Sequence, residues 1–115
     1  DKYEILTFDG GGEGGAISEL GSQRIVTVAL DKVLPVNKID FLKLDIEGAE
    51  AQALRGSKEL IKRSRPVIAL SLYHLPKDPW ELPALLQELC QDYSYFIRQH
   101  YFNSFESVLY AVPNY

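Results

Sequence analysis

The order of apolar segments predicts an α/β fold that runs strand, helix, strand, helix, strand, strand after an N-terminal β-hairpin. Residues 39–46 (IDFLKLDI) are almost continuously apolar, which indicates a strand covered on both faces of a sheet. A helical pattern follows over residues 49–63, and residues 67–73 (VIALSLY) read as a second buried strand. Because crossover connections are right-handed, these two strands are expected to be parallel neighbours.

The N-terminal part is predicted to be a hairpin of strands 3–8 and 24–30, followed by a connecting turn over residues 31–36. The glycine-rich loop after the first strand contains the pattern G-x-G-x-x-G at Gly10, Gly12 and Gly15. Only residues 16–23 lie between this pattern and the next strand, whereas a dinucleotide-binding crossover needs at least about 10–12 residues. The pattern is therefore read as a hairpin loop.

Helix signals resume at Asp78, which is expected to be the N-cap, with Pro79 in the first helical position and Glu81 completing a capping box. Pro83 is expected to interrupt this helix after a tight first turn. The apolar face of the helix is formed by Leu82, Leu85, Leu86, Leu89 and Cys90. The final strands, 95–102 and 108–112, are joined by a short turn and must be antiparallel.

Composition limits the classes of function. The 115 residues carry a net charge of −4 with scattered basic residues, which disfavours nucleic acids and anionic membranes as partners. Cys90 is the single cysteine, and its place in an apolar stripe predicts a buried, inert thiol of the kind that suits the cytoplasm. No apolar run approaches the roughly 20 residues of a membrane-spanning helix. The chain starts at Asp1 and lacks methionine, so we expect a fragment of a longer protein.

The segment 39–50 (IDFLKLDIEGAE) resembles the K-x-D-x-E-G-A-E signature of FkbM-type methyltransferases. The resemblance extends over essentially the whole chain, through Ala53-Leu54-Arg55-Gly56, Arg65-Pro66, Leu72-Tyr73-His74, Asp78-Pro79-Trp80, Pro83, Tyr93, Arg98, His100-Tyr101 and Leu109-Tyr110-Ala111. It implies a class I, Rossmann-like sheet, in which the four predicted core strands are the fourth to seventh, in the spatial order four, five, seven, six. It also implies a single partial domain over 1–115, with the hairpin and connector in 1–36 and the C-terminal α/β half in 37–115.

This resemblance further implies an S-adenosylmethionine-dependent methyltransferase that acts on the hydroxyl of a carbohydrate-like or other small acceptor. The family's first three strands and its glycine-bearing cofactor loop would lie upstream, so this chain alone is expected to be inactive and to bind the cofactor weakly or not at all. The alternative is a non-catalytic α/β interaction module that keeps half of the fold. In either case strand 39–46 is an apolar sheet edge, which predicts self-association or a neighbouring segment.

Ligands of open α/β sheets bind beyond the carboxyl ends of the parallel strands, which singles out Asp45, Glu47 and His74 as candidate catalytic residues. Asp45 is expected to lie near the transferred methyl group, to contact the cofactor, and to orient or deprotonate the acceptor. Its alternative roles are a helix N-cap or an ion-pair partner of Lys43.

Glu47 is expected to line the acceptor pocket without a metal, although two nearby carboxylates also suit a divalent cation and a helix N-terminus favours an acid. His74 suits proton transfer near neutral pH, or it is simply a hydrogen-bonded cap of its strand. Glu50 is predicted to be a surface acid, and Gly48 to allow close backbone approach. Other candidates rank below His74: Trp80 as a wall of the pocket, and Arg98, His100 and Tyr101 on the sixth strand.

Overall fold

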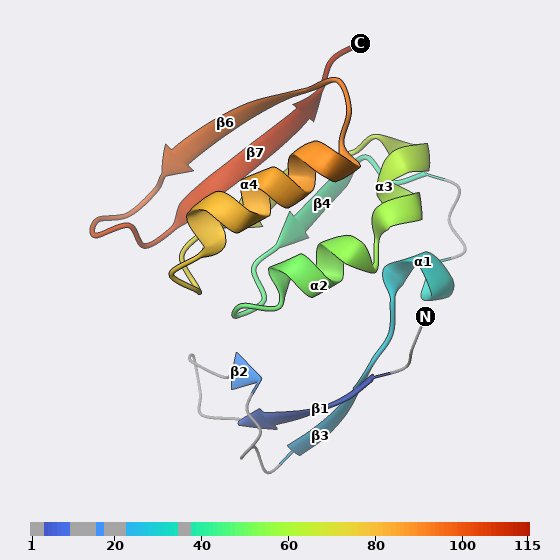
Figure 1. Ribbon diagram of the computed structural model, residues 1–115, viewed down its shortest axis with the longest axis vertical. Helices are drawn as coiled ribbons and strands as arrows, with labels where there is room; N and C mark the ends of the chain where they lie inside the picture. Colours follow the sequence, from blue (N-terminus) through green and yellow to red (C-terminus); the bar gives the residue numbers. More distant parts are fainter. Residues whose placement is uncertain (1–3, 10–15, 18–22, 35–37) are drawn as a thin grey trace.

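The structure is a computed structural model that describes residues 4–9, 16–17, 23–34 and 38–115. Its elements form two sheets and a layer of helices (Figure 1). In chain order they are β1 (Glu4–Asp9), β2 (Ala16–Ile17), β3 (Gln23–Thr27), α1 (Leu30–Val33), β4 (Phe41–Leu44), α2 (Glu50–Arg55), α3 (Lys58–Ser64), β5 (Val67–Ser71), α4 (Asp78–Leu89), β6 (Tyr93–Gln99) and β7 (Ser107–Pro113).

The main sheet has the strand order β4-β5-β7-β6, which confirms the predicted order. Strands β4 and β5 are parallel, with Leu42 opposite Ile68. Strand β7 is antiparallel to both of its neighbours, β5 and β6. The predicted α/β class and the antiparallel final hairpin are therefore confirmed, and the carboxyl ends of β4 and β5 lie next to each other.

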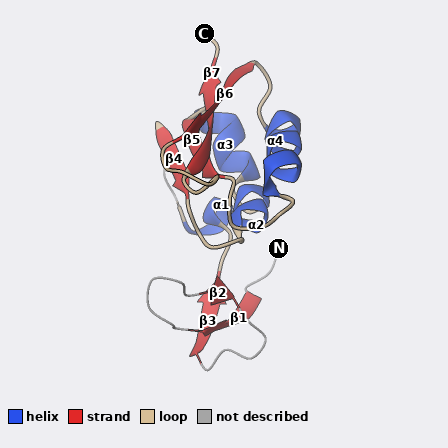
Figure 2. Cartoon of the chain, turned by 90° about the vertical axis from the view of Figure 1, so that its left-hand side faces the viewer, coloured by secondary structure: helices blue, strands red, loops and turns tan. Residues whose placement is uncertain are grey.

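Helices α2, α3 and α4 lie together on one side of this sheet (Figure 2). Burial along β4 alternates accordingly: Leu42 and Leu44 are buried, whereas Phe41 and Lys43 are exposed on the opposite face. The expectation that this strand is covered on both faces is wrong for the described chain. The core between helices and sheet is formed by Leu42, Leu44, Leu54, Ile61, Ile68, Leu70, Leu72, Leu82, Leu86, Cys90, Leu109 and Ala111.

The helix predicted over 49–63 is instead two helices, α2 and α3, that meet at Gly56 and Ser57. A Cβ atom at Gly56 would lie 3.3 Å from the Cα of Ala29, so glycine lets the preceding segment approach closely. The N–H of Asp31 donates to the Gly56 carbonyl, and the Asp31 carboxylate accepts from the N–H groups of Glu59 and Leu60. Asp31 thus caps α3 from a distant part of the sequence.

Helix α4 is continuous through Pro83, contrary to the predicted interruption. The N–H that proline lacks would have bonded to the carbonyl of Pro79 in the first turn, so only one hydrogen bond near the helix start is lost. The buried Leu82 and Leu86 hold this part of the helix against the sheet. Asp78 is the first helical residue rather than the N-cap, and its Oδ2 accepts from the N–H of Leu75 at 2.8 Å.

Strands β1 and β3 are antiparallel, as predicted for the hairpin, and β2 adds a third strand on the other side of β1. The glycines at positions 10, 12 and 15 lie outside the described residues. The second strand of the hairpin is shorter than the predicted 24–30: β3 ends at Thr27, and the helix α1 begins at Leu30. Among the helices of the described ranges, none has the length and apolar character needed to cross a bilayer.

Candidate active site

The candidate site lies where the chain leaves the parallel strands β4 and β5. Asp45 directly follows β4, and Tyr73 and His74 come shortly after the end of β5. The turn from β4 into α2 passes through Gly48, whose φ of 94° favours glycine. A Cβ atom there would lie 3.3 Å from the side chain of Leu75, so the predicted close approach at Gly48 is confirmed.

Asp45 is fixed by two hydroxyl donors, Ser71 at the end of β5 and Tyr73 just after it. Its Oδ1 accepts from the hydroxyls of Ser71 at 2.9 Å and Tyr73 at 3.2 Å, and its Oδ2 lies 3.5 Å from the Nζ of Lys43. Partial burial works to raise the pKa of Asp45, but the hydrogen bonds from Ser71 and Tyr73 and the charge of Lys43 outweigh it and lower the pKa. Asp45 is therefore held as a carboxylate, and its predicted contact with Lys43 is present.

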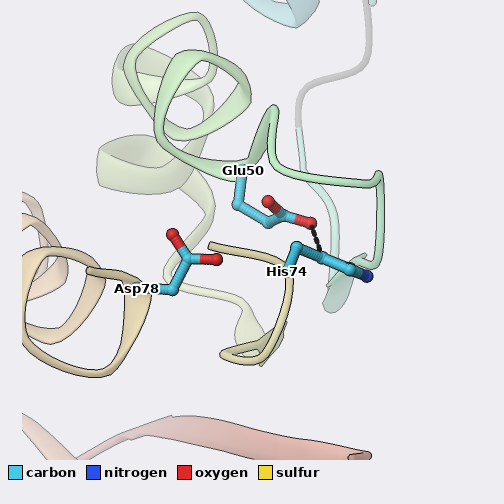
Figure 3. Close-up of side chains that lie close together, drawn as sticks. All are labelled: Glu50, His74 and Asp78. Carbon is cyan, nitrogen blue, oxygen red and sulfur yellow. Dashed lines mark hydrogen bonds and ion pairs between the residues drawn. The ribbon is translucent and has the colours of Figure 1, made fainter. Parts of the chain in front are cut away.

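His74 lies among three carboxylates, and its side chain is only 5% exposed. Its Nδ1 lies 2.7 Å from Oε1 of Glu50 (Figure 3). Its Nε2 lies 3.3 Å from Oδ1 of Asp45 and 3.9 Å from Oε1 of Glu47. The structure thus brings the three sequence-predicted candidates, Asp45, Glu47 and His74, to one place.

The prediction that Glu50 is a surface acid is wrong, because its side chain is only 1% exposed. Its Oε1 accepts from the N–H of Ile46 at 2.9 Å as well as facing His74. A carboxylate accepts hydrogen bonds, so Glu50 favours the tautomer of a neutral imidazole that carries its proton on Nδ1. The Nε2 of His74 faces Asp45 and Glu47, and it is buried without a hydrogen-bond partner among the described residues. No pattern in the sequence indicated this role, because the partner of Glu50 lies 24 positions away.

Glu50, His74 and Asp78 each place a ligand atom within 4.8 Å of the others (Figure 3). Two carboxylates and an imidazole form a donor set that suits transition-metal ions. Hydrogen bonds already use much of this set: Glu50 accepts from Ile46 and faces His74, and Asp78 accepts from Leu75. These bonds leave Oε2 of Glu50 and Nε2 of His74 without a hydrogen-bond partner among the described residues. The expectation that the site works without a metal stays a prediction.

Two cavities open beside the site and share Tyr73 and Phe105. One, of about 530 Å³, is lined by Tyr73, His100, Tyr101, Phe102, Phe105 and Glu106. The other, of about 510 Å³, is lined by residues that include His74, Leu75, Ile97 and Ser107. The pKa of Tyr73 is raised, and burial is the largest cause. The charge and hydrogen bond of Asp45 raise it further, as do the charges of Glu106 and Glu47. Tyr73 therefore stands as a neutral hydroxyl between the carboxylates and the cavities.

The remaining sequence candidates differ in their positions. Strand β6 ends at Gln99, so His100 and Tyr101 do not lie on it as predicted but follow it and line a cavity. Arg98 bonds to the carbonyl of Ile97 and lies over the ring of Phe96, away from the candidate residues. Trp80 is 64% exposed and lines neither cavity.

The mixed sheet, with carboxylates and a histidine at the carboxyl ends of its parallel strands, has the Rossmann-like architecture of a methyltransferase. The structure is similar to the crystal structure of a methyltransferase FkbM from Methylobacillus flagellatus KT, with a TM-score of 0.71 and 30% sequence identity over 76% of this chain. The profile of the methyltransferase FkbM domain matches residues 5–105, and the chain belongs to this family.

The chain spans 23% of the length of that solved methyltransferase. Comparison with curated proteins gives no significant match.

Proposed function

We propose that this chain contributes the catalytic base and the acceptor side of an S-adenosylmethionine-dependent O-methyltransferase. The observation that carries the proposal is the position of His74, whose Nδ1 faces the buried Glu50 and whose Nε2 faces Asp45 and Glu47. The proposed acceptor is a small hydroxylated molecule such as a carbohydrate. A cytoplasmic location belongs to the same proposal and is supported by the free, buried thiol of Cys90.

The residues at the site fit the charge of the cofactor. Asp45 and Glu47 are 35% and 48% exposed, so their carboxylates are accessible to a cationic ligand. Asp45 also stays ionised, because its pKa is lowered. When bound, S-adenosylmethionine supplies a methyl group activated by a positively charged sulfur. We assign Asp45 and Glu47 to the cationic side of that ligand.

The chain's own residues then manage the proton of the acceptor. Glu50 holds the His74 ring with its Nε2 toward Asp45 and Glu47. This nitrogen is buried and has no hydrogen-bond partner among the described residues, so it takes the proton of the acceptor hydroxyl only where acceptor binding opens access to it. The positive charge that forms on the ring lies beside Glu50 and Asp45. Asp45, which Ser71 and Tyr73 keep in place, orients the hydroxyl. Methyl transfer needs no covalent enzyme intermediate. The chain therefore accelerates the reaction by aligning the acceptor hydroxyl and by accepting its proton.

Calorimetry with S-adenosylmethionine tests the proposal on this chain and on the longest natural polypeptide that contains it. We expect the longer polypeptide to bind the cofactor and transfer the methyl group. His74→Ala should keep cofactor binding but lower kcat by on the order of 100-fold or more, whereas Asp45→Asn should weaken cofactor binding as well as lower kcat. Lys62→Ala, on the exposed side of α3, is the control and should change neither quantity. Binding by neither polypeptide would refute the proposal and favour the non-catalytic interaction module.

A further inference from the structure

The turn between β6 and β7 presents three large aromatic side chains to solvent. Tyr101, Phe102 and Phe105 are 59%, 60% and 57% exposed. Single exposed apolar residues are ordinary on protein surfaces, but a contiguous aromatic group marks a binding site. In the described structure this group lies beside Tyr73, whose ring centroid is 6.2 Å from that of Phe105.

Hydrogen bonds hold the turn in a defined conformation. The N–H of His100 donates to the carbonyl of Glu106 at 3.1 Å, and the hydroxyl of Ser107 donates to the carbonyl of Ser104 at 2.7 Å. Asn103, Ser104 and Glu106 have φ values of 54°, 65° and 58°, which residues other than glycine adopt only at a conformational cost. Such strain clusters at functional sites, where the backbone must present side chains in one direction.

The residues that line the cavity beside this turn indicate the charge of a ligand that it would bind. Its six lining residues are five with aromatic rings (Tyr73, His100, Tyr101, Phe102 and Phe105) and the acid Glu106. No lysine or arginine belongs to this lining set, and Asp45 lies 3.2 Å behind the hydroxyl of Tyr73. The faces of aromatic rings attract cations, and a carboxylate at the rim adds to that attraction. An anionic ligand would meet repulsion at the same place.

We propose that this aromatic cavity binds a small organic cation, the ammonium group of a hydroxylated amine such as an amino alcohol or an amino sugar. The assignment of this amine as the methyl acceptor rests on the function proposed above, whereas its binding does not. Tyr73 links the two places: its ring lines the cavity and lies 4.4 Å, between centroids, from the ring of His74. The proposal places the ammonium against the aromatic rings and the hydroxyl of the same amine on the side of Tyr73 that faces His74.

The test compares choline with its uncharged isostere 3,3-dimethyl-1-butanol, by calorimetry or NMR titration of the chain. Choline should bind about 10-fold more tightly than the neutral alcohol, as expected for a cation against several aromatic faces. Phe102→Ala, Phe105→Ala and Glu106→Gln should each weaken choline binding by about 5-fold. Phe96→Ala removes an exposed ring outside the cavity and is the matched control. Glu106→Gln is a surface change that leaves the apolar packing intact.

Equal binding of choline and the neutral alcohol would overturn the proposal, because the cavity would then be merely apolar. Competition of choline with S-adenosylmethionine but not with S-adenosylhomocysteine, which lacks the sulfonium charge, would assign the cavity to the sulfonium of the cofactor and overturn the acceptor assignment. Choline binding that depends on Phe102 and Glu106 would support the cation site even if methyl transfer were never observed. The two proposals therefore fail separately.

Discussion

The Nδ1 of His74 and the Oε1 of Glu50 lie 2.7 Å apart, and both side chains are almost completely buried. This contact joins the start of α2 to the segment after β5, the two segments that form the candidate site. The same oxygen of Glu50 accepts from the N–H of Ile46. A buried carboxylate is costly unless it is hydrogen-bonded, and these two partners satisfy only Oε1, because Oε2 of Glu50 is buried without a partner among the described residues.

Replacing Glu50 by Gln should therefore affect both stability and catalysis. The change replaces two hydrogen bonds to a charged acceptor with weaker neutral ones, so we expect a loss of about 1–2 kcal/mol in the free energy of unfolding. If the proposed mechanism holds, kcat should fall while KM changes little, because the orientation of His74 is lost. Urea denaturation and steady-state kinetics measure the two effects. Glu59→Gln, whose side chain is 65% exposed, is the control, and equal stability of both variants would contradict the assignment.

Asp31→Ala should destabilise the fold by removing the cap of α3. The carboxylate of Asp31 accepts from the N–H of Glu59 at 3.0 Å and of Leu60 at 2.7 Å. Loss of such a cap costs about 1–2 kcal/mol, which urea denaturation will detect. The matched variant Asp40→Ala removes a carboxylate that is 91% exposed and should cost less than about 0.5 kcal/mol. A cost for Asp31→Ala no larger than that control would show that the cap contributes nothing.

Ser71→Ala should raise the pKa of Asp45 toward its ordinary value of 3.8, because the Ser71 hydroxyl is a donor that lowers it. A pKa that is lower in the folded state gives stability that is present above the unfolded-state pKa and lost as pH falls through the folded-state pKa. The variant should therefore be less stable than the wild type at neutral pH, and the difference should shrink in strong acid.

NMR titration of the Asp45 carboxyl carbon measures this pKa directly, and urea denaturation at both pH values measures the stability. Ser94→Ala serves as the control, because the Ser94 hydroxyl donates to the amide oxygen of Asn114 instead. An unchanged pKa of Asp45 in Ser71→Ala would disprove the role of that hydrogen bond.

The Cys90 thiol should react slowly in the native protein. Burial raises its pKa to about 11, so at pH 8 only about one molecule in a thousand carries the reactive thiolate. Labelling with iodoacetamide should be slow in buffer and fast in urea, with mass spectrometry as the readout. Equally fast labelling in both conditions would contradict the burial of this residue.

Local patterns and the family signature were enough to predict the main sheet. The apolar runs 39–46 and 67–73, with the right-handed crossover rule, predicted two parallel neighbouring strands, and the observed pairing of β4 with β5 agrees. The features that could not be predicted depend on contacts between distant residues. The break between α2 and α3 follows from the approach of Ala29 to Gly56, and the burial of Glu50 follows from a histidine 24 positions later. No periodicity within a helix encodes such partners.

For the candidate site, the sequence predicted where Asp45, Glu47 and His74 converge, because the ends of parallel strands are adjacent by topology. It did not predict the aromatic cavity. Tyr101, Phe102 and Phe105 have no apolar periodicity, yet they line one cavity from a turn in which Asn103, Ser104 and Glu106 have positive φ values. A polar turn containing several aromatic residues was the available signal.

Strand β4 is an edge of the main sheet, and we propose that the protein self-associates through it. Phe41 on this strand is 56% exposed, and β4 has a partner strand only on the side of β5 among the described residues. Exposed apolar edges pair with other chains, and a lysine on the edge opposes such pairing. Phe41→Lys should therefore reduce self-association in sedimentation velocity runs over a range of concentrations. The control is Val33→Lys, which places the same charge on α1, at a residue that is 45% exposed. It should leave self-association unchanged. A wild type that sediments as a monomer throughout, or two variants that associate equally, would show that the β4 edge is not the contact.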